Sequence, residues 1–268
     1  MATTRQVHGV DFSGASNAGE HIWIASGQRD GDTLRIDTCV EAHTLPHGET
    51  ARDPCMSALT KFVERNPSSI FGFDFPFAIP DDITNLADWE TFVLDFSDSF
   101  DDPDHFFDTC ISRGAALPGE HVEYKRQTEI NADTPWCAYN WRIRHQTYYG
   151  IGTLLANFVH NENARILPMQ PPAHDLPWIV EVCPSCTLGN YSLPRTGYKG
   201  SGTQHEHRRT DIVDGLESNQ ISLSEDVRET AIQNTGGDAL DSIIAADAAA
   251  RALEADVRPV GIEGRIYV

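Results

Sequence analysis

Two aspartates stand alone in apolar segments of the first half of the chain. Asp11 lies in VHGVDFSGA and Asp74 in IFGFDFPF, and both segments have the composition of buried strands. Burying an unpaired carboxylate costs several kcal/mol, so each of these side chains needs a partner. Two neighbouring carboxylates repel each other, and a cation between them removes that conflict. The pair therefore predicts a site for a divalent ion with oxygen ligands, Mg²⁺ or Mn²⁺.

Three more acidic residues are candidates for the same site. Asp238 and Asp241 begin the segment DALDSIIAADAAARAL, whose alanines predict a long helix, and their spacing puts both on one face of its first turn. Each also has a simpler explanation, because Asp238 can cap the helix and Asp241 can interact with its dipole. Glu181 is a lone carboxylate in the apolar segment WIVEVCP, where it is a metal ligand, a general base or the partner of an arginine.

The segments that carry these residues occur in an informative order. The patterns predict strands over 7–15, 20–28, 33–42, 70–77, 176–184 and 261–268. Turn signals join the first three strands into an antiparallel meander, and a predicted helix over 49–67 makes the fourth strand parallel to the first. This is the order of an α/β fold of the RNase H-like type, with a mixed five-stranded sheet flanked by helices. In that fold the first and fourth strands are central neighbours, so we expect Asp11 and Asp74 to be adjacent.

The length and composition of the chain set further bounds. Its 268 residues, 40% of them hydrophobic, suffice for one large α/β domain. Because no linker or repeat divides the sequence, we expect a single domain over 1–268 with an inserted helical region at about 81–175. No apolar segment approaches the roughly 20 residues that a membrane helix needs. The N-terminal segment also lacks the apolar core of a signal peptide, so we expect a cytoplasmic protein without a membrane partner.

The charge of the chain is strongly negative. Acidic residues outnumber basic ones by 40 to 20, which gives a formal net charge of −20, and they are spread over the whole sequence. This pattern is typical of adaptation to molar internal salt, as in halophilic archaea, where repulsion is screened within roughly 3 Å at 1 M. An acidic surface argues against nucleic-acid partners at ordinary salt, but molar salt weakens that argument.

A family resemblance follows from the same motifs. The segments GVDFSGA, GFDFPFAIP, EVCPSCTL, YKG followed by RR, DALDSIIAADAAARAL and EGRIYV appear in this order over nearly the whole chain. Their order resembles the predicted RNase H-like nuclease family, catalogued as domain-of-unknown-function family four-two-nine. The resemblance implies a metal-dependent nuclease, with Glu181 in the family's Glu-x-x-Pro motif and four aspartates at its acidic positions: Asp11, Asp74, Asp238 and Asp241.

The chemistry that these acids would serve is metal-assisted phosphodiester hydrolysis of nucleic acid or a nucleotide. One ion activates water, and a second, about 3.5–4 Å away, stabilises the leaving oxygen. Four basic residues are candidates to hold phosphate: Lys199, Arg208, Arg209 and Arg126. Arg208 and Arg209 can instead pair with acidic neighbours on a helix predicted over 206–217. The aromatic-rich segment over 137–150 offers stacking surfaces for bases, although packing in the core is the simpler explanation.

The cysteines allow two weaker hypotheses. Six cysteines in a cytoplasmic chain of this length do not indicate a disulfide framework. Cys183 and Cys186 with His205 and His207 would make a tetrahedral zinc site. A redox dithiol needs a helix that begins after the pair, and the segment TLGNYSLP does not predict one.

Two other functions stay open. The segment DFSGASNAG is similar to the first phosphate loop of actin-like and sugar-kinase ATPases, which share this sheet topology, so an ATP-dependent phosphotransferase is one alternative. Such a protein also needs a glycine-rich loop after the fourth strand, where FPFAIPDD stands instead. A non-catalytic binding module of the same fold is the other alternative. Melting temperatures separate these cases, because a ligand stabilises the protein that binds it.

Overall fold

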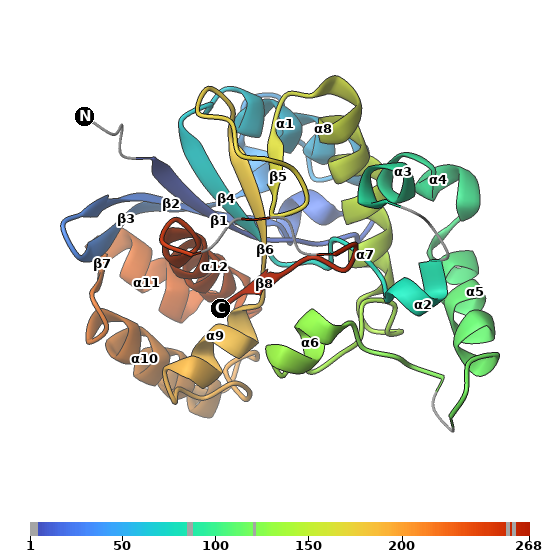
Figure 1. Ribbon diagram of the computed structural model, residues 1–268. Helices are drawn as coiled ribbons and strands as arrows, with labels where there is room; N and C mark the ends of the chain where they lie inside the picture. Colours follow the sequence, from blue (N-terminus) through green and yellow to red (C-terminus); the bar gives the residue numbers. More distant parts are fainter. Residues whose placement is uncertain (1–4, 85–87, 120–121, 256–257, 259–260) are drawn as a thin grey trace.

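A twisted β-sheet runs through the centre of the computed structural model, which describes residues 5–84, 88–119, 122–255, 258 and 261–268 (Figure 1). Its strands are β1 (Gln6–Asp11), β2 (Trp23–Asp30), β3 (Thr33–Glu41), β4 (Ser69–Phe73), β5 (Arg165–Leu167), β6 (Trp178–Val182), β7 (Ile221–Leu223) and β8 (Ile266–Tyr267). They lie in the order β5-β6-β4-β1-β2-β3-β7, and β8 pairs with β6 beyond the end of β5.

This strand order confirms the predicted mixed α/β fold. β1, β2 and β3 form an antiparallel meander, and β4 pairs in parallel with β1 on one side and with β6 on the other. The central order β3-β2-β1-β4-β6 is therefore the RNase H-like arrangement that the sequence predicts. Over the described residues, the sheet has eight strands where the sequence predicts five: the closing strand joins it as β8 beside β6, and its two edges are extended by β5 and β7. Each of these two edge strands has three residues, which is too short to leave an alternating pattern in the sequence.

Helices cover both faces of the sheet. They are α1 (Arg52–Glu64), α2 (Asp81–Thr84), α3 (Trp89–Leu94), α4 (Phe96–Ser99), α5 (Pro103–Ala115), α6 (Gln127–Asn131), α7 (Arg144–Tyr149), α8 (Ala156–Asn161), α9 (Pro184–Asn190), α10 (Thr203–Glu217), α11 (Glu225–Gln233) and α12 (Asp238–Ala252). Short 3-10 turns occur at Ala18–Glu20 and Ala42–Thr44, and a π-helical stretch joins α7 to α8 over Gly150–Leu155.

The two faces of the sheet bury two hydrophobic clusters. α9, α10, α11 and α12 lie on one side, and α1 and α8 lie on the other (Figure 1). Successive residues of β4 point to opposite sides, so Ile70 packs in the α12 cluster and Phe71 in the α1 cluster. The α1 cluster continues into the helices between β4 and β6 through Phe96, Phe106 and Phe158. The region predicted as an insertion at about 81–175 thus extends the core of that face, and its β5 joins the sheet.

The helix α12 lies unusually close to the central strands because two glycines make room for it. A Cβ atom on Gly9 of β1 would lie 2.1 Å from the backbone nitrogen of Ala246. A Cβ atom on Gly72 of β4 would lie 2.6 Å from the carbonyl oxygen of Ala245. This contact brings the first turn of α12 to the carboxyl ends of β1 and β4. Among the described residues, none of the helices has both the length and the apolar character needed to cross a bilayer.

Candidate active site

Asp11 and Asp74 come together at the carboxyl ends of two parallel strands. Asp11 is the last residue of β1, and Asp74 directly follows β4. The register pairs Val10 with Phe73, and the amide of Asp74 donates to the carbonyl of Val10 at 3.0 Å. The two carboxylates therefore occupy equivalent positions on neighbouring strands, as their place in the sequence predicts. Asp11 is 8% exposed and Asp74 is partly buried.

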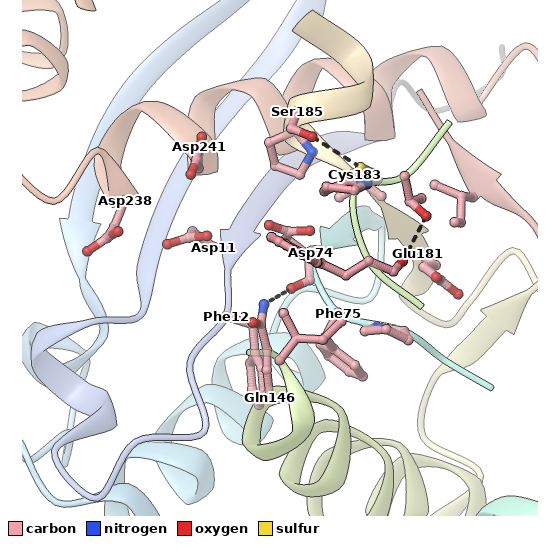
Figure 2. A pocket seen from close by; sticks show the side chains of 18 of the residues that line it. Asp11, Phe12, Asp74, Phe75, Gln146, Glu181, Cys183, Ser185, Asp238 and Asp241 are labelled. Carbon is pink, nitrogen blue, oxygen red and sulfur yellow. Dashed lines mark hydrogen bonds between the residues drawn. The ribbon is translucent and has the colours of Figure 1, made fainter. Parts of the chain in front are cut away.

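The first turn of α12 brings two more carboxylates to the same place. Asp238, Asp241, Asp11, Asp74 and Glu181 all line one cavity of about 730 Å³ (Figure 2). Asp238 is not the cap of the helix as predicted, because the N-cap is Gly237, with φ +80°. A side chain at Gly237 would crowd Lys199 and Tyr198, which leaves glycine as the residue that fits both the angle and the space.

Lys199 is the basic residue that touches these acids. Its Nζ lies 2.7 Å from Oδ2 of Asp241 and 3.6 Å from Oδ1 of Asp238, and its side chain is 51% exposed. The hydroxyl of Tyr198 donates to Oδ1 of Asp241 at 2.8 Å. The Asp241 carboxylate raises the pKa of Lys199 above its usual value, so the lysine stays charged. Both oxygens of Asp241 are thereby held in a fixed orientation.

The electrostatics of Asp11 and Asp74 differ from those of Asp241. Burial raises the pKa of Asp11 well above its usual range, and the carboxylates of Asp241, Asp238 and Asp74 raise it further against the opposing effect of Lys199. Burial, then Asp241, raises the pKa of Asp74 to about 8. Within the described part of the chain, neither of these two carboxylates accepts a hydrogen bond. Their ionised forms therefore lack the fixed compensation that buried charges need.

Glu181 belongs to a different arrangement at the other end of the cavity. It lies on β6 opposite Phe73, and its oxygens accept from the Arg126 guanidinium, at 2.9 Å for one of the two bonds, and from the amide of Phe77 at 3.0 Å. Arg126 also contacts Glu129 at 3.0 Å, and the three side chains are almost fully buried. Of the roles open to Glu181, the structure favours the partner of an arginine. The predicted phosphate role of Arg126 is not supported, because its buried guanidinium already pairs with two carboxylates.

The two helical arginines lie away from the acidic cluster. Arg209 is 2% exposed and donates to three backbone carbonyls, those of Ile232 at 2.6 Å, Tyr198 at 2.6 Å and Gly200 at 3.0 Å. These bonds hold the loop on both sides of Lys199, so Arg209 positions Lys199, and Arg209 itself is outside the set of described residues that line the cavity. Arg208 is outside the set of described residues that line the cavity. Neither predicted phosphate contact from this helix is supported.

The predicted zinc set is not assembled. Cys183 and Cys186 are joined to each other by a disulfide, which removes the thiolates that zinc would need. Nδ1 of His205 lies 2.8 Å from the carbonyl oxygen of Gly197. In the part of the chain that the structure describes, no three His, Cys, Asp or Glu side chains are grouped closely enough to hold an ion.

The acidic cluster nevertheless has the donor chemistry of a hard divalent cation. Its donors are all carboxylate oxygens, which are the ligands that Mg²⁺ and Mn²⁺ prefer. Asp11 and Asp74 have raised pKa values and no fixed partner, so a cation between them would relieve their repulsion. The arrangement is not closed around a common point, since Lys199 holds Asp241. The carboxylate oxygens are suitable ligands for Mg²⁺ or Mn²⁺, but the aspartate side chains would have to rotate to bind one common ion.

Several residues that line the cavity escape sequence analysis. Gln146 of α7 donates to the backbone carbonyl of Asp74, and no motif marks it (Figure 2). Trp136 is 39% exposed beside the cavity, with the Arg142 guanidinium 5.0 Å from its ring centroid. Farther along, Trp141 is 57% exposed and Arg144 lies 3.4 Å from its ring centroid. Core packing, the simpler explanation for the aromatic segment, therefore does not hold for Trp141. The exposure of the two tryptophans depends on the fold, so the sequence pattern alone does not reveal it.

Comparisons with known proteins give little beyond this geometry. No family model matches the chain, and no curated protein matches it. Among solved structures, the chain is similar to the yeast mitochondrial Holliday junction resolvase Ydc2, with 8% sequence identity and a TM-score of 0.41, over 91% of this chain and 78% of that chain. That likeness is too distant to carry an inference about activity. Membership of the RNase H-like nuclease family stays a prediction.

Proposed function

We propose that the cavity hydrolyses phosphodiester bonds of nucleic acid with the help of Mg²⁺ or Mn²⁺. The observation that carries this proposal is the pair Asp11 and Asp74, two carboxylates at adjacent strand ends with raised pKa values and with no ion pair to any residue that the structure describes. Asp238 and Asp241 supply further oxygen donors from α12 in the same cavity. An ion pair with Lys199 compensates Asp241 and Asp238, but it leaves the charges of Asp11 and Asp74 without a partner, and an uncompensated buried charge lowers stability.

Each residue of the cluster has a role in this proposal. Asp11, Asp74, Asp238 and Asp241 would hold the metal, whose chemistry is to polarise a phosphate oxygen and to acidify a water molecule. Tyr198 orients Asp241 through its hydrogen bond. Lys199, which is half-exposed and charged, is placed to hold a non-bridging phosphate oxygen, and Arg209 fixes the loop that carries it.

The decisive experiment measures cleavage and metal binding in parallel. Single- and double-stranded DNA and RNA are incubated with the protein at molar KCl, with Mg²⁺, Mn²⁺ or EDTA. Asp11→Asn and Asp74→Asn are expected to lower cleavage by more than about 100-fold, since even groups that only orient a ligand contribute roughly 10–100-fold. Asp37→Asn is the matched control, because Asp37 lies on β3, about half-exposed, and pairs with Arg35.

Thermal unfolding provides the second readout. Mn²⁺ is expected to raise the melting temperature of the wild type and of Asp37→Asn, and to have no such effect on Asp11→Asn, because only a protein that binds the ion is stabilised. Stabilisation by ATP without any effect of polynucleotide would contradict the proposal and favour a phosphotransferase. The absence of any shift with metal, ATP or nucleic acid would contradict it in favour of a non-catalytic binding module.

A further inference from the structure

A disulfide joins Cys183 and Cys186 in the wall of the candidate active site. Cys183 follows β6 and is the N-cap of α9, so the helix begins between the two cysteines, which are separated by three positions. The expectation that no helix begins at this pair is wrong. The sequence PSCTLGN has low helix propensity, and the burial of Leu188 against the α12 cluster stabilises the helix instead.

The two cysteines differ in their exposure to solvent. Cys183 is partly exposed and lines the cavity together with Pro184 and Ser185, whereas Cys186 is 3% exposed. The Ser185 hydroxyl lies 3.9 Å from Sγ of Cys183, and both residues line the cavity (Figure 2). A reagent that enters the cavity therefore meets Cys183 first, and Cys186 is the sulfur that leaves.

The remaining cysteines of the chain provide a contrast. None of the four forms a disulfide: Cys55, Cys110 and Cys137 are buried, and Cys39 is partly exposed. Burial raises the pKa of the Cys55 thiol to about 11 and those of Cys39, Cys110 and Cys137 to about 12. Because the thiolate is the reactive form, these four side chains are inert at neutral pH. The sulfur that faces the cavity is thus set apart from every other cysteine by position.

We propose that Cys183–Cys186 is a thiol–disulfide exchange site, which a dithiol reductant reaches through the cavity. A thiolate of the reductant attacks Sγ of Cys183, the bond between the two cysteines breaks, and Cys186 leaves as a thiolate that takes up a proton. The second thiol of the reductant then attacks the mixed disulfide and releases Cys183 as a thiolate. Two electrons pass from the reductant to the protein, the reductant ends as a disulfide, and the chain gains two thiols.

The Cys183–Cys186 disulfide lies close in the structure to elements that carry acids of the cavity. Cys183 is two residues after Glu181 on the same chain segment, and the disulfide ties the end of β6 to α9. α9 is in turn joined to α12 by the hydrogen bond of 2.9 Å from the Tyr191 hydroxyl, just past its last residue, to Asp247. The exchange itself requires neither a metal nor a nucleic acid, so it can be tested whether or not the cavity hydrolyses phosphodiesters.

The test compares single cysteine variants in the folded protein. Cys186→Ser leaves a thiol that faces the cavity, and Cys183→Ser leaves a thiol that is buried. With 5,5′-dithiobis(2-nitrobenzoate) under native conditions, we expect Cys186→Ser to react at least about tenfold faster than Cys183→Ser, because only the former presents an accessible thiol. The double variant Cys183→Ser/Cys186→Ser reports the background from the other four cysteines.

The wild type is then treated with dithiothreitol without denaturant, alkylated with iodoacetamide and weighed by mass spectrometry. Two alkyl groups are expected, both at the Cys183–Cys186 pair, and none in an untreated sample. Alkylation that needs denaturant would overturn the proposal, because the bond would then be closed to reagents in the cavity. Equal reaction rates of the two single variants would overturn the assigned direction of attack. Neither outcome depends on whether nuclease activity is found.

Discussion

The cavity holds carboxylates at two ends. At the balanced end a buried arginine pairs with both acids, whereas at the unbalanced end Asp11 and Asp74 have no ion pair among the described residues. At one end, Arg126 lies between Glu129 and Glu181, and backbone amides of Phe77 and Arg126 supply further hydrogen bonds. At the other end, Asp11 and Asp74 have carboxylate neighbours and only the distant influence of Lys199. The difference teaches that a buried acid is not in itself a sign of chemistry. A buried acid without a fixed counter-charge is the feature that needs a ligand.

The largest expected effect comes from breaking the balanced end. Arg126→Met would leave Glu129 and Glu181 buried without their cation, which typically costs about 3–5 kcal/mol. Chemical denaturation at neutral pH and molar KCl measures the free energy of unfolding. The matched control is Arg35→Met, since the side chains of Arg35 and Asp37 are both about half-exposed and surface ion pairs contribute little to stability. If Arg126→Met lowers the free energy of unfolding no more than the control does, Arg126 does not stabilise the buried acids, and the proposed difference between the two ends is wrong.

At the unbalanced end, removal of a charge is expected to stabilise the protein. A folded-state pKa of about 8 at Asp74 means that the native protein binds a proton more tightly than the unfolded chain. Stability of the wild type therefore falls as pH rises from about 4 to 8, the window between the unfolded and folded pKa values. Asp74→Asn removes this loss, so it should stabilise the protein at pH 8 by about 1–2 kcal/mol after solvent screening of this partly exposed group.

Melting temperatures of Asp74→Asn and wild type between pH 4 and 9 check this expectation. The difference between the two proteins should grow with pH and should shrink when Mn²⁺ is added at pH 8, because a bound cation supplies the missing charge. Asp37→Asn should show neither change. A difference between Asp74→Asn and wild type that stays constant over the whole pH range would contradict the assignment of Asp74 as the unbalanced acid.

The residue contacts at the two ends also differ in how well the sequence predicts them. Asp11 and Asp74 are adjacent because β1 and β4 are adjacent, and strand order follows from the meander and the helix crossover. The pairing of Arg126 with Glu181 spans 55 positions, and Arg126 lies just before the short helix α6, where no pattern fixes its direction. Sequence reasoning therefore finds candidate charges, and tertiary packing decides which of them are neutralised.

The same distinction explains the basic residues and the cysteines. The motif YKG marks Lys199 as a candidate, yet its contact with Asp241 depends on a loop that Arg209 holds by bonds to the carbonyls of Tyr198 and Gly200. A buried arginine that donates to backbone carbonyls has no sequence signature. The sequence therefore predicts Arg209 as a phosphate ligand, and only the fold shows its backbone partners. At Cys183, local propensity argues against a helix, and packing against the α12 cluster overrides it.

The smallest expected effect is on the binding of nucleic acid by Trp136. Trp136 lies beside the balanced end, next to Thr134 and Pro135 in the cavity wall, and its ring is open to solvent at the edge. If this end holds a base of the nucleic acid while the acids at the other end hold the metal, Trp136→Ala should weaken binding of a single-stranded oligonucleotide by about 1 kcal/mol, the low end for base stacking.

Fluorescence anisotropy with a labelled oligonucleotide in EDTA measures this loss separately from cleavage. The Mn²⁺-induced rise in melting temperature should be unchanged in Trp136→Ala, and oligonucleotide affinity should be unchanged in Asp11→Asn without metal. Leu94→Ala is the control, since Leu94 is an exposed apolar residue on α3 that does not line the cavity. If Trp136→Ala and Asp11→Asn lose the same readout, the two ends act as one site, and the division between a metal-holding and a base-holding end is wrong.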